Sequence, residues 1–517
     1  MIKWNKEKRL LSQQQSKFWK YELKDVDEPN LFKDIFPYSE VGRIVFDNKI
    51  IPISPPEEIF ITDTTFRDGQ QARPPYSVEQ IVDIFKLLHK LGGPNGVIRQ
   101  TEFFLYSKKD RQAVDECLKL GFKFPEITGW IRAAIEDIPL VKAAGLKETG
   151  LLTSVSDYHI FLKLNKKRSQ ALDDYLGIVK SVLDLGIVPR CHFEDITRAD
   201  IYGFCIPFAT ELMNLREESG IDIKIRLCDT MGYGITYPGA ALPRSVDKLV
   251  RAFIEDAGVP GHLLEWHGHN DFHKAMINAS TAWLYGCSAA NSTLLGLGER
   301  TGNPPIESLI MEYIALKGHD DGIDTTVITD IAEYFEREIG VKIPHNYPFV
   351  GSEFNVTRAG VHADGLIKCE EIYNIFDTNK ILKRPIVTMI SDKSGNAGIA
   401  FWLNQRFNLK DENAIDKRHP AISKINKWIT AEYESGRQTS ISPEELEKKV
   451  RKYLPEIFMS ELEKIKVTAE KAAVAAVNQI IELAEMKSMN PEVQEPLMQK
   501  FVDEHPSVQF AYIVDLN

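Results

Sequence analysis

The stretch IFITDTTFRDGQQARPPYSVEQIVDIFKLLHKLG, residues 59–92, joins a short β-rich run to a longer segment with helical periodicity. In its second part, residues 77–92, apolar side chains recur at intervals of three and four, which is typical of an amphipathic helix. The same alternation of strand and helix then repeats along the chain. Seven further β-rich runs follow, at 97–104, 123–130, 146–153, 187–193, 221–230, 262–269 and 287–298.

Eight strand–helix units within about 260 residues are what an α/β fold of the (β/α)8 TIM-barrel type requires. A doubly wound open sheet is the alternative, but no phosphate-binding fingerprint follows the first strand. The glycine-rich GLGERTG (296–302) follows the last strand and has too many residues between its second and third glycine. We therefore expect a TIM-barrel catalytic domain over residues 59–318.

Three further regions flank this barrel. Residues 1–58 are rich in turn formers and predict an N-terminal arm that wraps the surface. A glycine-punctuated segment predicts a second module over 319–405, and a charged helical pattern predicts a helical C-terminal region over 406–517. Within that region SPEE (442–445) predicts a capped helix start, and PSVQFAYIVDLN (506–517) predicts a strand.

Composition excludes several classes of protein. The net charge of −11, without a long Lys/Arg tract, disfavours a nucleic-acid binder. The six cysteines show no CxxC spacing, and the start MIKWNKEKRL lacks the apolar core of a signal peptide. The longest apolar segment, 467–486, is interrupted by charges and suits an amphipathic helix better than a membrane span. We expect a cytoplasmic protein that binds neither nucleic acid nor membrane.

Candidate metal ligands collect at the predicted C-terminal ends of strands, the face that carries the active site in such barrels. The first strand runs into Asp68, and the seventh ends in HGHND, with His267 and His269 on one side because side chains alternate along a strand. One carboxylate and two imidazoles suit Mn²⁺, Zn²⁺, Co²⁺ or Mg²⁺. Asn303, just past the last strand, could add an amide oxygen. The alternative is a polar network that caps the barrel mouth without metal.

The fifth predicted strand places Arg190, His192 and Glu194 on one face. A buried arginine needs an anionic partner, which could be Glu194 or a substrate carboxylate. Thr230, at the end of the sixth strand, could donate a hydroxyl nearby or merely cap a helix.

Five segments resemble, in the same order, the signature segments of the metal-dependent Claisen-condensing acyltransferases, which include the 2-isopropylmalate, homocitrate, citramalate and Re-citrate synthases. These segments are TDTTFRDGQQ (62–71), EDITR (194–198), CDTMGYG (228–234), HGHND (267–271) and GLGERTGNPPIESL (296–309). GGPNGVIRQTEFF (92–104) and FPEITGWIR (124–132) look most similar to the Re-citrate synthases.

The resemblance implies a set of site residues. The implied metal ligands are Asp68, His267, His269 and Asn303, and Arg67 and Gln71 would orient a 2-oxo acid, with Arg67 close to its keto oxygen. It also implies that the 319–405 module is a lid, in which His362 and Tyr373 complete the site across a homodimer. We expect Glu194 and His362, with Tyr373 assisting, to remove a methyl proton from acetyl-CoA, so that the resulting enolate attacks the keto carbon.

The resemblance also bears on which oxo acid is used. An arginine four residues before Glu194 belongs to the homocitrate type, where it meets a distal carboxylate, so Arg190 favours a dicarboxylic substrate. His192 and Thr230 are further expected substrate contacts. Because RDGQQ departs from the homocitrate pattern, we place citrate formation from oxaloacetate ahead of homocitrate formation, with 2-isopropylmalate formation also open.

Two other functions stay open at this stage. Related 3-hydroxy-3-methylglutaryl-CoA lyases carry a catalytic Cys loop after the last strand, whereas GLGERTG has none, which favours synthesis over cleavage. A non-catalytic scaffold that works through its helical tail is the second alternative. A decayed site would be expected to lose ligands or the base, and all of these positions are filled.

Overall fold

The computed structural model describes residues 2–5, 10–13, 21–458, 466, 469–475 and 477. The predicted strand at 506–517 and most of the predicted amphipathic segment 467–486 lie outside these residues. The described chain forms two compact units. One takes in the residues up to Phe354 together with Thr378–Arg384, and the other takes in Asn355–Asp377 and the residues from Pro385 onward.

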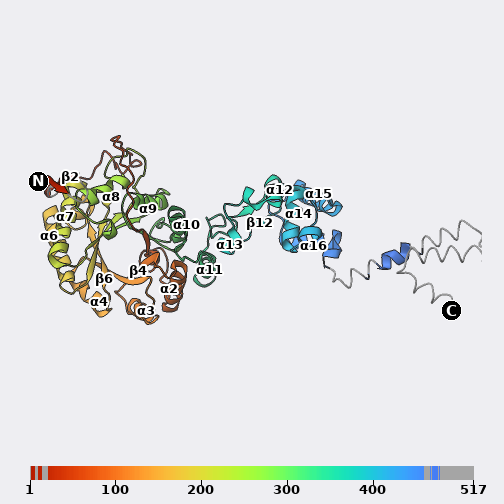
Figure 1. Cartoon of the computed structure of the whole chain (residues 1–517), viewed down its shortest axis with the longest axis horizontal. Coiled ribbons are helices and arrows are strands. Elements are labelled where there is room, and N and C mark those ends of the chain that lie inside the picture. The colour runs from red at the N-terminus through yellow and green to blue at the C-terminus, as the bar shows by residue number, and fades with distance from the viewer. Residues whose placement is uncertain are drawn as a thin grey trace, which may run out of the picture. The chain divides into compact units, whose positions relative to one another are not determined.

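Eight parallel strands close into a barrel in the order of the sequence, with β10 paired to β3 (Figure 1). They are β3 (Phe60–Asp63), β4 (Ile98–Phe104), β5 (Glu126–Arg132), β6 (Glu148–Ser154), β7 (Val188–Glu194), β8 (Lys224–Asp229), β9 (Leu264–Gly268) and β10 (Ala289–Ser292). Each overlaps one of the eight predicted β-rich runs, and β5, β6 and β7 extend one or two residues beyond theirs. The predicted TIM barrel is confirmed.

Helices alternate with these strands and surround the barrel (Figure 1). They are α1 (Asp68–Gln71), α2 (Val78–Gly92), α3 (Lys108–Lys119), α4 (Ile138–Ala143), α5 (Asp157–Ile160), α6 (Arg168–Leu183), α7 (Ile206–Ser219), α8 (Val246–Glu255), α9 (Ala275–Leu284) and α10 (Ile306–Lys317). Helix α2 shows why the quoted stretch folds in this way. Ser77 and Gln80 form a capping box at its start, and its apolar residues at three- and four-residue spacing are buried.

Charged side chains occupy much of the barrel interior, where TIM barrels usually carry branched apolar residues. Glu102, Arg190, Arg226 and Glu265 are each at most 3% exposed. They come from β4, β7, β8 and β9, and Nη1 of Arg226 crosses the barrel to lie 3.0 Å from Oε2 of Glu102. Buried charges are tolerated when they are paired, and each of these four has an oppositely charged partner.

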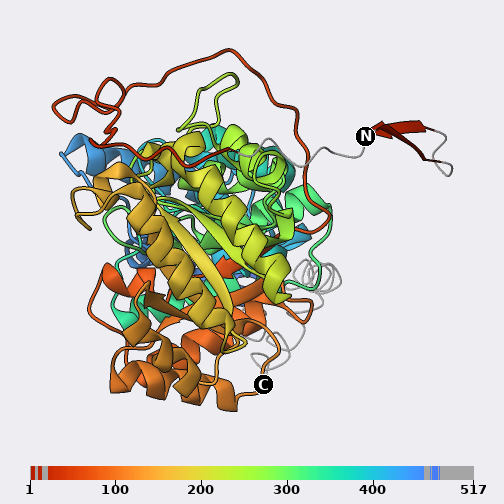
Figure 2. The ribbon, with the colours of Figure 1, turned by 90° about the vertical axis from the view of Figure 1, so that its left-hand side faces the viewer.

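The N-terminal segment from residue 21 to 58 runs along the outside of the barrel (Figure 2). The backbone NH of Asn30 donates to Oδ2 of Asp157 at 2.7 Å, and Nη1 of Arg168 donates to the carbonyl oxygen of Lys24 at 3.0 Å. Farther along, the NH of Ser54 donates to the carbonyl of Leu284 at 2.9 Å. These bonds attach the arm to α5, α6 and α9 before the chain enters β3.

The first unit extends beyond the barrel helices. Helix α11 (Val327–Tyr334) packs against α2, and Nζ of Lys90 lies 3.3 Å from Oδ2 of Asp330. Farther on, Nε2 of Gln80 donates to the carbonyl of Glu338 at 2.9 Å. A short helix, α13 (Thr378–Leu382), also belongs to this unit. The compact unit that contains the barrel therefore extends past residue 318 to Phe354.

The second unit has its own core. Its elements are β11 (Val356–Thr357), α12 (Gly360–Lys368), β12 (Val387–Thr388), α14 (Gly395–Arg406), α15 (Pro420–Glu434) and α16 (Pro443–Tyr453). Apolar residues of α14, α15 and α16 form one cluster, so this core spans the predicted boundary at 405/406. Ser442 caps α16 with the predicted capping box. Nε of Arg406 donates to Oε1 of Glu447 at 2.7 Å, which joins α14 to α16.

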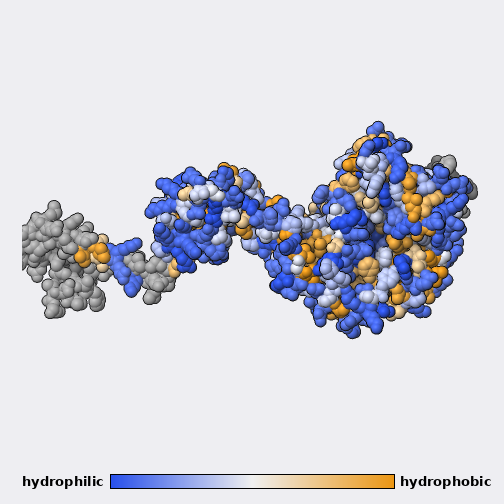
Figure 3. All heavy atoms as spheres, turned by 180° about the vertical axis from the view of Figure 1, so that it is seen from behind, coloured by the Kyte–Doolittle hydropathy of each residue, from blue (hydrophilic) through white to orange (hydrophobic). Residues whose placement is uncertain are grey.

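The surface of both units is mostly hydrophilic in the view of Figure 3, with hydrophobic residues scattered over it. A short two-stranded sheet of β1 (Ile2–Asn5) and β2 (Leu10–Gln13) lies at the N-terminus. Among the described residues, no helix has both the length and the apolar character that a membrane span requires.

Candidate metal centre

Asp68 lies between two imidazoles at the C-terminal end of the barrel. Its Oδ2 is 3.3 Å from Nε2 of His267 and 3.5 Å from Nε2 of His269. All three residues are buried, and their potential ligand atoms lie within 4.8 Å of one another. Asp68 opens α1 after the short turn that follows β3, His267 lies in β9, and His269 comes just after that strand ends. The structure thus brings together the three residues that the sequence placed at two separate strand ends.

A hydrogen bond with Asn291 fixes the orientation of the His267 ring. Its Nδ1 lies 2.7 Å from Oδ1 of Asn291, which is buried on β10. An amide oxygen only accepts hydrogen bonds, so Nδ1 carries a proton, and Nε2 is the ring nitrogen that faces Asp68. A carbonyl or carboxylate behind a histidine is the usual support for a metal-binding imidazole.

Asn303 supplies a further oxygen. Its Nδ2 donates to the carbonyl of Gly268 at 3.2 Å, which holds the side chain against the end of β9. Its Oδ1 is buried and has no hydrogen-bond partner among the described residues. A buried oxygen left in this state is costly in free energy unless something binds it. A divalent cation would satisfy it, so the donor set of one carboxylate, two imidazoles and one amide oxygen fits such an ion.

The charge state of these residues suits a cation. Burial by itself would raise the pKa of Asp68, but the Arg67 guanidinium beside it holds that pKa well below its usual range. Burial lowers the pKa of His269 to about 4, so its imidazole is neutral at pH 7. The NH of Glu299 also donates to Oδ1 of Asp68 at 3.1 Å. An ionised carboxylate and a neutral imidazole are the forms that bind metals.

Arg67 lies beside this centre. Its Nη1 is 3.4 Å from Oδ2 of Asp68, and its Nε donates to Oε2 of Glu102 at 2.8 Å. Its Cζ stands 5.8 Å from the ring centre of Trp130. Gln71, at the end of α1, is exposed instead of buried with Arg67. The structure therefore brings Arg67, but not Gln71, into the buried part of the site.

Glu194 ends β7 at the same face of the barrel. Its Oε2 accepts a hydrogen bond from the Ser154 hydroxyl and lies 3.3 Å from both Nδ1 of His159 and Nζ of Lys163. The hydroxyl oxygen of Thr230 accepts from the NH of Asp195 at 2.8 Å, so Thr230 fixes the backbone next to Glu194. The structure thus gives Glu194 polar neighbours from the end of β6 and from the segment that follows it.

Arg190 is paired with Glu148 and Glu265 instead of Glu194. Its Nη2 lies 3.0 Å from Oε1 of Glu148, and its Nη1 lies 3.1 Å from Oε2 of Glu265. These carboxylates balance its charge within the barrel, without Glu194. The anionic partners that a buried arginine requires are therefore Glu148 and Glu265, and not Glu194. A direct contact between Arg190 and a substrate stays a prediction.

His192 lies above Arg190 in the barrel interior. Its Nε2 is 3.4 Å from Oε1 of Glu102, and burial lowers the pKa of His192 to about 3. The imidazole is therefore neutral at pH 7. Gly150 makes this approach possible, because a Cβ there would lie 2.6 Å from Nε2 of His192 and 3.0 Å from Oε1 of Glu102.

Several polar residues of this region were not among the predicted ones: Glu102, Glu148, Glu265, His159 and Lys163. A signal existed for the three glutamates, since each stands inside a predicted β-rich run, where a buried carboxylate requires a cation. No spacing or composition signal marks His159 and Lys163, because they belong to α5 and the loop after it.

His362 and Tyr373 belong to the second unit. His362 lies on α12, Tyr373 follows the short turn after it, and their ring centres are 4.4 Å apart. Both side chains are exposed. The structure brings these two predicted residues together, in a unit separate from the one that holds Asp68.

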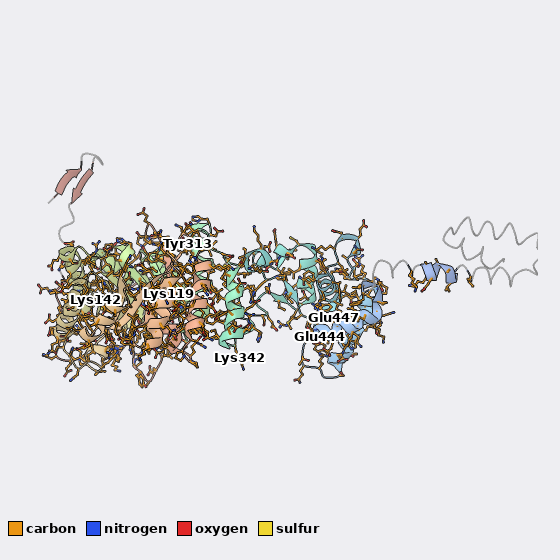
Figure 4. All side chains as sticks on the ribbon, turned by 90° about the horizontal axis from the view of Figure 1, so that it is seen from below. Lys119, Lys142, Tyr313, Lys342, Glu444 and Glu447 are labelled. Atoms are coloured by element: carbon orange, nitrogen blue, oxygen red, sulfur yellow. The ribbon has the colours of Figure 1, made fainter. Side chains whose placement is uncertain are left out.

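A cleft of about 390 Å³ borders the candidate metal centre. The loop Leu295–Asn303 forms one side of it, and the segment 341–344 with Tyr347 forms another. Lys342, labelled in Figure 4, is exposed on this second side. Asn303 thus contributes to the cleft as well as to the metal centre.

Comparison with known proteins places these features in a family. The HMGL-like family model matches residues 58–335. The chain is 74% identical over 517 residues to a citrate (Re)-synthase of Syntrophus aciditrophicus, covering 100% of this chain and 82% of that protein. It is 53% identical over 438 residues to a citrate (Re)-synthase of Clostridium kluyveri, covering 85% and 97%. A 2-phosphinomethylmalate synthase of Streptomyces hygroscopicus is 35% identical over 437 residues, with 83% and 98% covered. The chain belongs to the HMGL-like family, in the branch of the citrate (Re)-synthases.

Proposed function

We propose that this protein condenses the acetyl group of acetyl-CoA with oxaloacetate, and that water then hydrolyses the thioester of the product to release citrate and CoA. The observation that carries the proposal is the 74% identity, over the whole chain, with a protein named citrate (Re)-synthase. The site supports it, since Asp68, His267 and His269 form a buried donor set beside an arginine. Homocitrate and 2-isopropylmalate formation are the alternatives within the same chemistry.

In this proposal, different residues bind the metal, stabilise the keto oxygen and orient the carboxylate of the oxo acid. A divalent cation held by Asp68, His267, His269 and Asn303 would polarise the keto carbonyl of the oxo acid. Arg67 would donate hydrogen bonds to the keto oxygen and stabilise the negative charge that develops there. Gln71, exposed at the end of α1, would orient the substrate carboxylate next to that carbonyl.

Proton removal from acetyl-CoA is assigned to Glu194 at the end of β7. Its carboxylate has Ser154, His159 and Lys163 as neighbours, which fix its orientation. A positioned base of this kind contributes about 10²–10⁴-fold to such a step. We assign assisting roles to His362 and Tyr373 in a homodimer. Thr230 and His192 complete the expected substrate contacts.

The cleft next to Asn303 is the proposed entrance for acetyl-CoA. It borders a metal ligand, and the exposed ammonium group of Lys342 suits the negative phosphates of the coenzyme. We further propose that the protein is a homodimer, which sedimentation of the purified protein would test, and that it is cytoplasmic. The cysteines among the described residues are all unpaired, as suits a reducing compartment.

The direct test is CoA release from acetyl-CoA and Mn²⁺ with oxaloacetate, 2-oxoglutarate, 2-oxoisovalerate and pyruvate supplied separately. We expect the highest kcat/KM with oxaloacetate and citrate as the product identified by mass spectrometry. A higher kcat/KM with another oxo acid would contradict the substrate, and no CoA release with any acid would contradict the activity. Asp68→Asn should abolish Mn²⁺ binding and citrate formation together, while full activity in a folded variant would remove Asp68 from the site.

A further inference from the structure

One stretch of the N-terminal arm, residues 41–50, carries apolar side chains on the outside of the protein (Figure 2). Every residue from 43 to 50 is exposed. The exposed apolar residues of the stretch are Val41, Ile44, Val45, Phe46 and Ile50, and Phe46 alone is 50% exposed. Apolar residues that are scattered singly over a surface need no explanation, but a group of this kind indicates contact with another molecule.

The backbone of this stretch is attached to the loop 239–241 along one of its edges. The carbonyl of Val45 accepts a hydrogen bond from that loop at 2.8 Å, and the NH of Asp47 donates to it at 3.0 Å. Between them, Phe46 forms an isolated antiparallel bridge with the same loop. Nζ of Lys248 also pairs with Oδ1 of Asp47. These bonds hold residues 45–47 in a strand-like arrangement on the surface.

The opposite edge of this strand is open. Along a strand, the NH and carbonyl groups of successive residues point to opposite edges, so those of Ile44 and Phe46 point away from the loop 239–241. Within the part of the chain that the structure describes, neither residue makes a backbone–backbone hydrogen bond. An open strand edge is a template for pairing with a further strand, and exposed apolar side chains beside it favour such pairing.

A second copy of the same strand fits this edge. When two copies pair antiparallel about a two-fold axis at Val45, Ile44 of one copy lies opposite Phe46 of the other. Each such pair exchanges both of its backbone hydrogen bonds, and the two-fold axis makes the pair occur twice. In the same register Arg43 of one copy lies opposite Asp47 of the other, which brings opposite charges together. A two-fold interface requires a surface that is complementary to itself, and this strand is such a surface.

We infer that residues 43–47 form a contact between two copies of this chain, in which the open strand edges pair antiparallel about Val45. The contact covers Ile44 and Phe46 and satisfies the backbone groups that the barrel leaves open. The inference extends the proposed homodimer by naming its surface. It depends on the geometry of the strand and not on the proposed condensation, so the two can fail separately.

Disulfide cross-linking tests the register. The two Val45 residues face each other as a pair without hydrogen bonds, so their Cα atoms should lie about 4.5 Å apart, within reach of a disulfide. In the full chain with Cys369→Ser, which removes an exposed thiol, oxidised Val45→Cys should run as a dimer on a non-reducing gel. Val41→Cys is the control, since Val41 is more exposed but would lie about 27 Å from its own copy. Absence of the Val45→Cys dimer, or equal cross-linking of both variants, would overturn the inference.

Sedimentation over a range of protein concentrations measures the strength of the contact. Phe46→Asp should raise the dimer Kd at least about tenfold, because the contact would then bury a charge without a partner. Leu185→Asp is the control, since Leu185 is similarly exposed, follows α6 and should leave the dimer Kd unchanged. A dimer of Phe46→Asp as tight as wild type would overturn this surface and leave the homodimer standing. A wild type that stays monomeric at all concentrations would overturn both, whatever its rate of citrate formation.

Discussion

Arg300 and Asp271 form a two-bond ion pair, with Nε 3.0 Å from Oδ1 and Nη2 3.2 Å from Oδ2. The pair joins the segment after β9 to the loop after β10, and the NH of Asn270 donates to the carbonyl of Gly302 at 2.9 Å beside it. His269 lies two residues before Asp271, and Asn303 lies three residues after Arg300. The ion pair therefore helps to set the spacing between two predicted metal ligands that come from different strands.

Arg300→Gln should weaken Mn²⁺ binding about tenfold, because the two segments that carry His269 and Asn303 lose their charged connection. Isothermal titration of the purified protein measures this change. Arg337→Gln is the control, since Arg337 makes an exposed pair with Glu338 far along the chain and should leave Mn²⁺ affinity unchanged. Equal affinities in Arg300→Gln and wild type would show that the loops keep their spacing without this pair.

Asn291→Ala should lower Mn²⁺ affinity by about 10- to 100-fold, although Asn291 is not a predicted ligand. The reason is that Nδ1 of His267 loses the oxygen 2.7 Å away, which fixes its ring and its tautomer. Asn278→Ala removes another fully buried amide, one that donates to the carbonyl of Gly234, and should not alter metal affinity. Unchanged affinity in Asn291→Ala would mean that His267 is oriented by its own backbone.

Gly150→Ala should reduce stability by about 1–3 kcal/mol, since overpacking displaces neighbouring side chains. Its Cβ would lie 2.6 Å from Nε2 of His192, inside the charged barrel interior. Gly177→Ala, inside α6 with nothing within 4 Å of the added Cβ, should instead be neutral or stabilise the protein by about 0.5–1 kcal/mol. The melting temperature should therefore fall by several degrees in Gly150→Ala, and it should stay the same or rise in Gly177→Ala. A Gly150→Ala protein as stable as wild type would show that the interior can adjust.

Glu307→Gln should change how stability depends on pH. Burial raises the pKa of Glu307 from its ordinary 4.5 to about 7. The folded state thus holds a proton that the unfolded state releases, so this group's contribution is fully present below pH 4.5 and is lost as pH rises through 7. Relative to wild type, Glu307→Gln should gain stability between pH 5 and pH 8, which melting temperatures at both values would show. The absence of this gain would mean that Glu307 is already ionised in the folded protein at pH 5.

The barrel was predictable because strand and helix periodicities alternate eight times. The cluster of Asp68, His267 and His269 was predictable because all three follow predicted strands, whose C-terminal ends meet at one face of a barrel. The comparisons confirm the family resemblance. The partners of Arg190 were not predictable, because Glu148 and Glu265 reach it across a barrel whose register depends on all eight strands. Unit limits also depend on packing that no local pattern reports, such as that of α11 against α2.

The charged barrel interior has a consequence for how this sequence can change over time. Arg226 and Glu265 stand directly opposite each other on β8 and β9 but are separated by 39 positions in the chain. Replacing either one alone strands a charge in a place that water does not reach, at a cost of about 3–5 kcal/mol. Substitutions of these paired interior charges are therefore expected to arise in compensating pairs, so that an alignment of relatives should show these distant positions covarying as if they were neighbours.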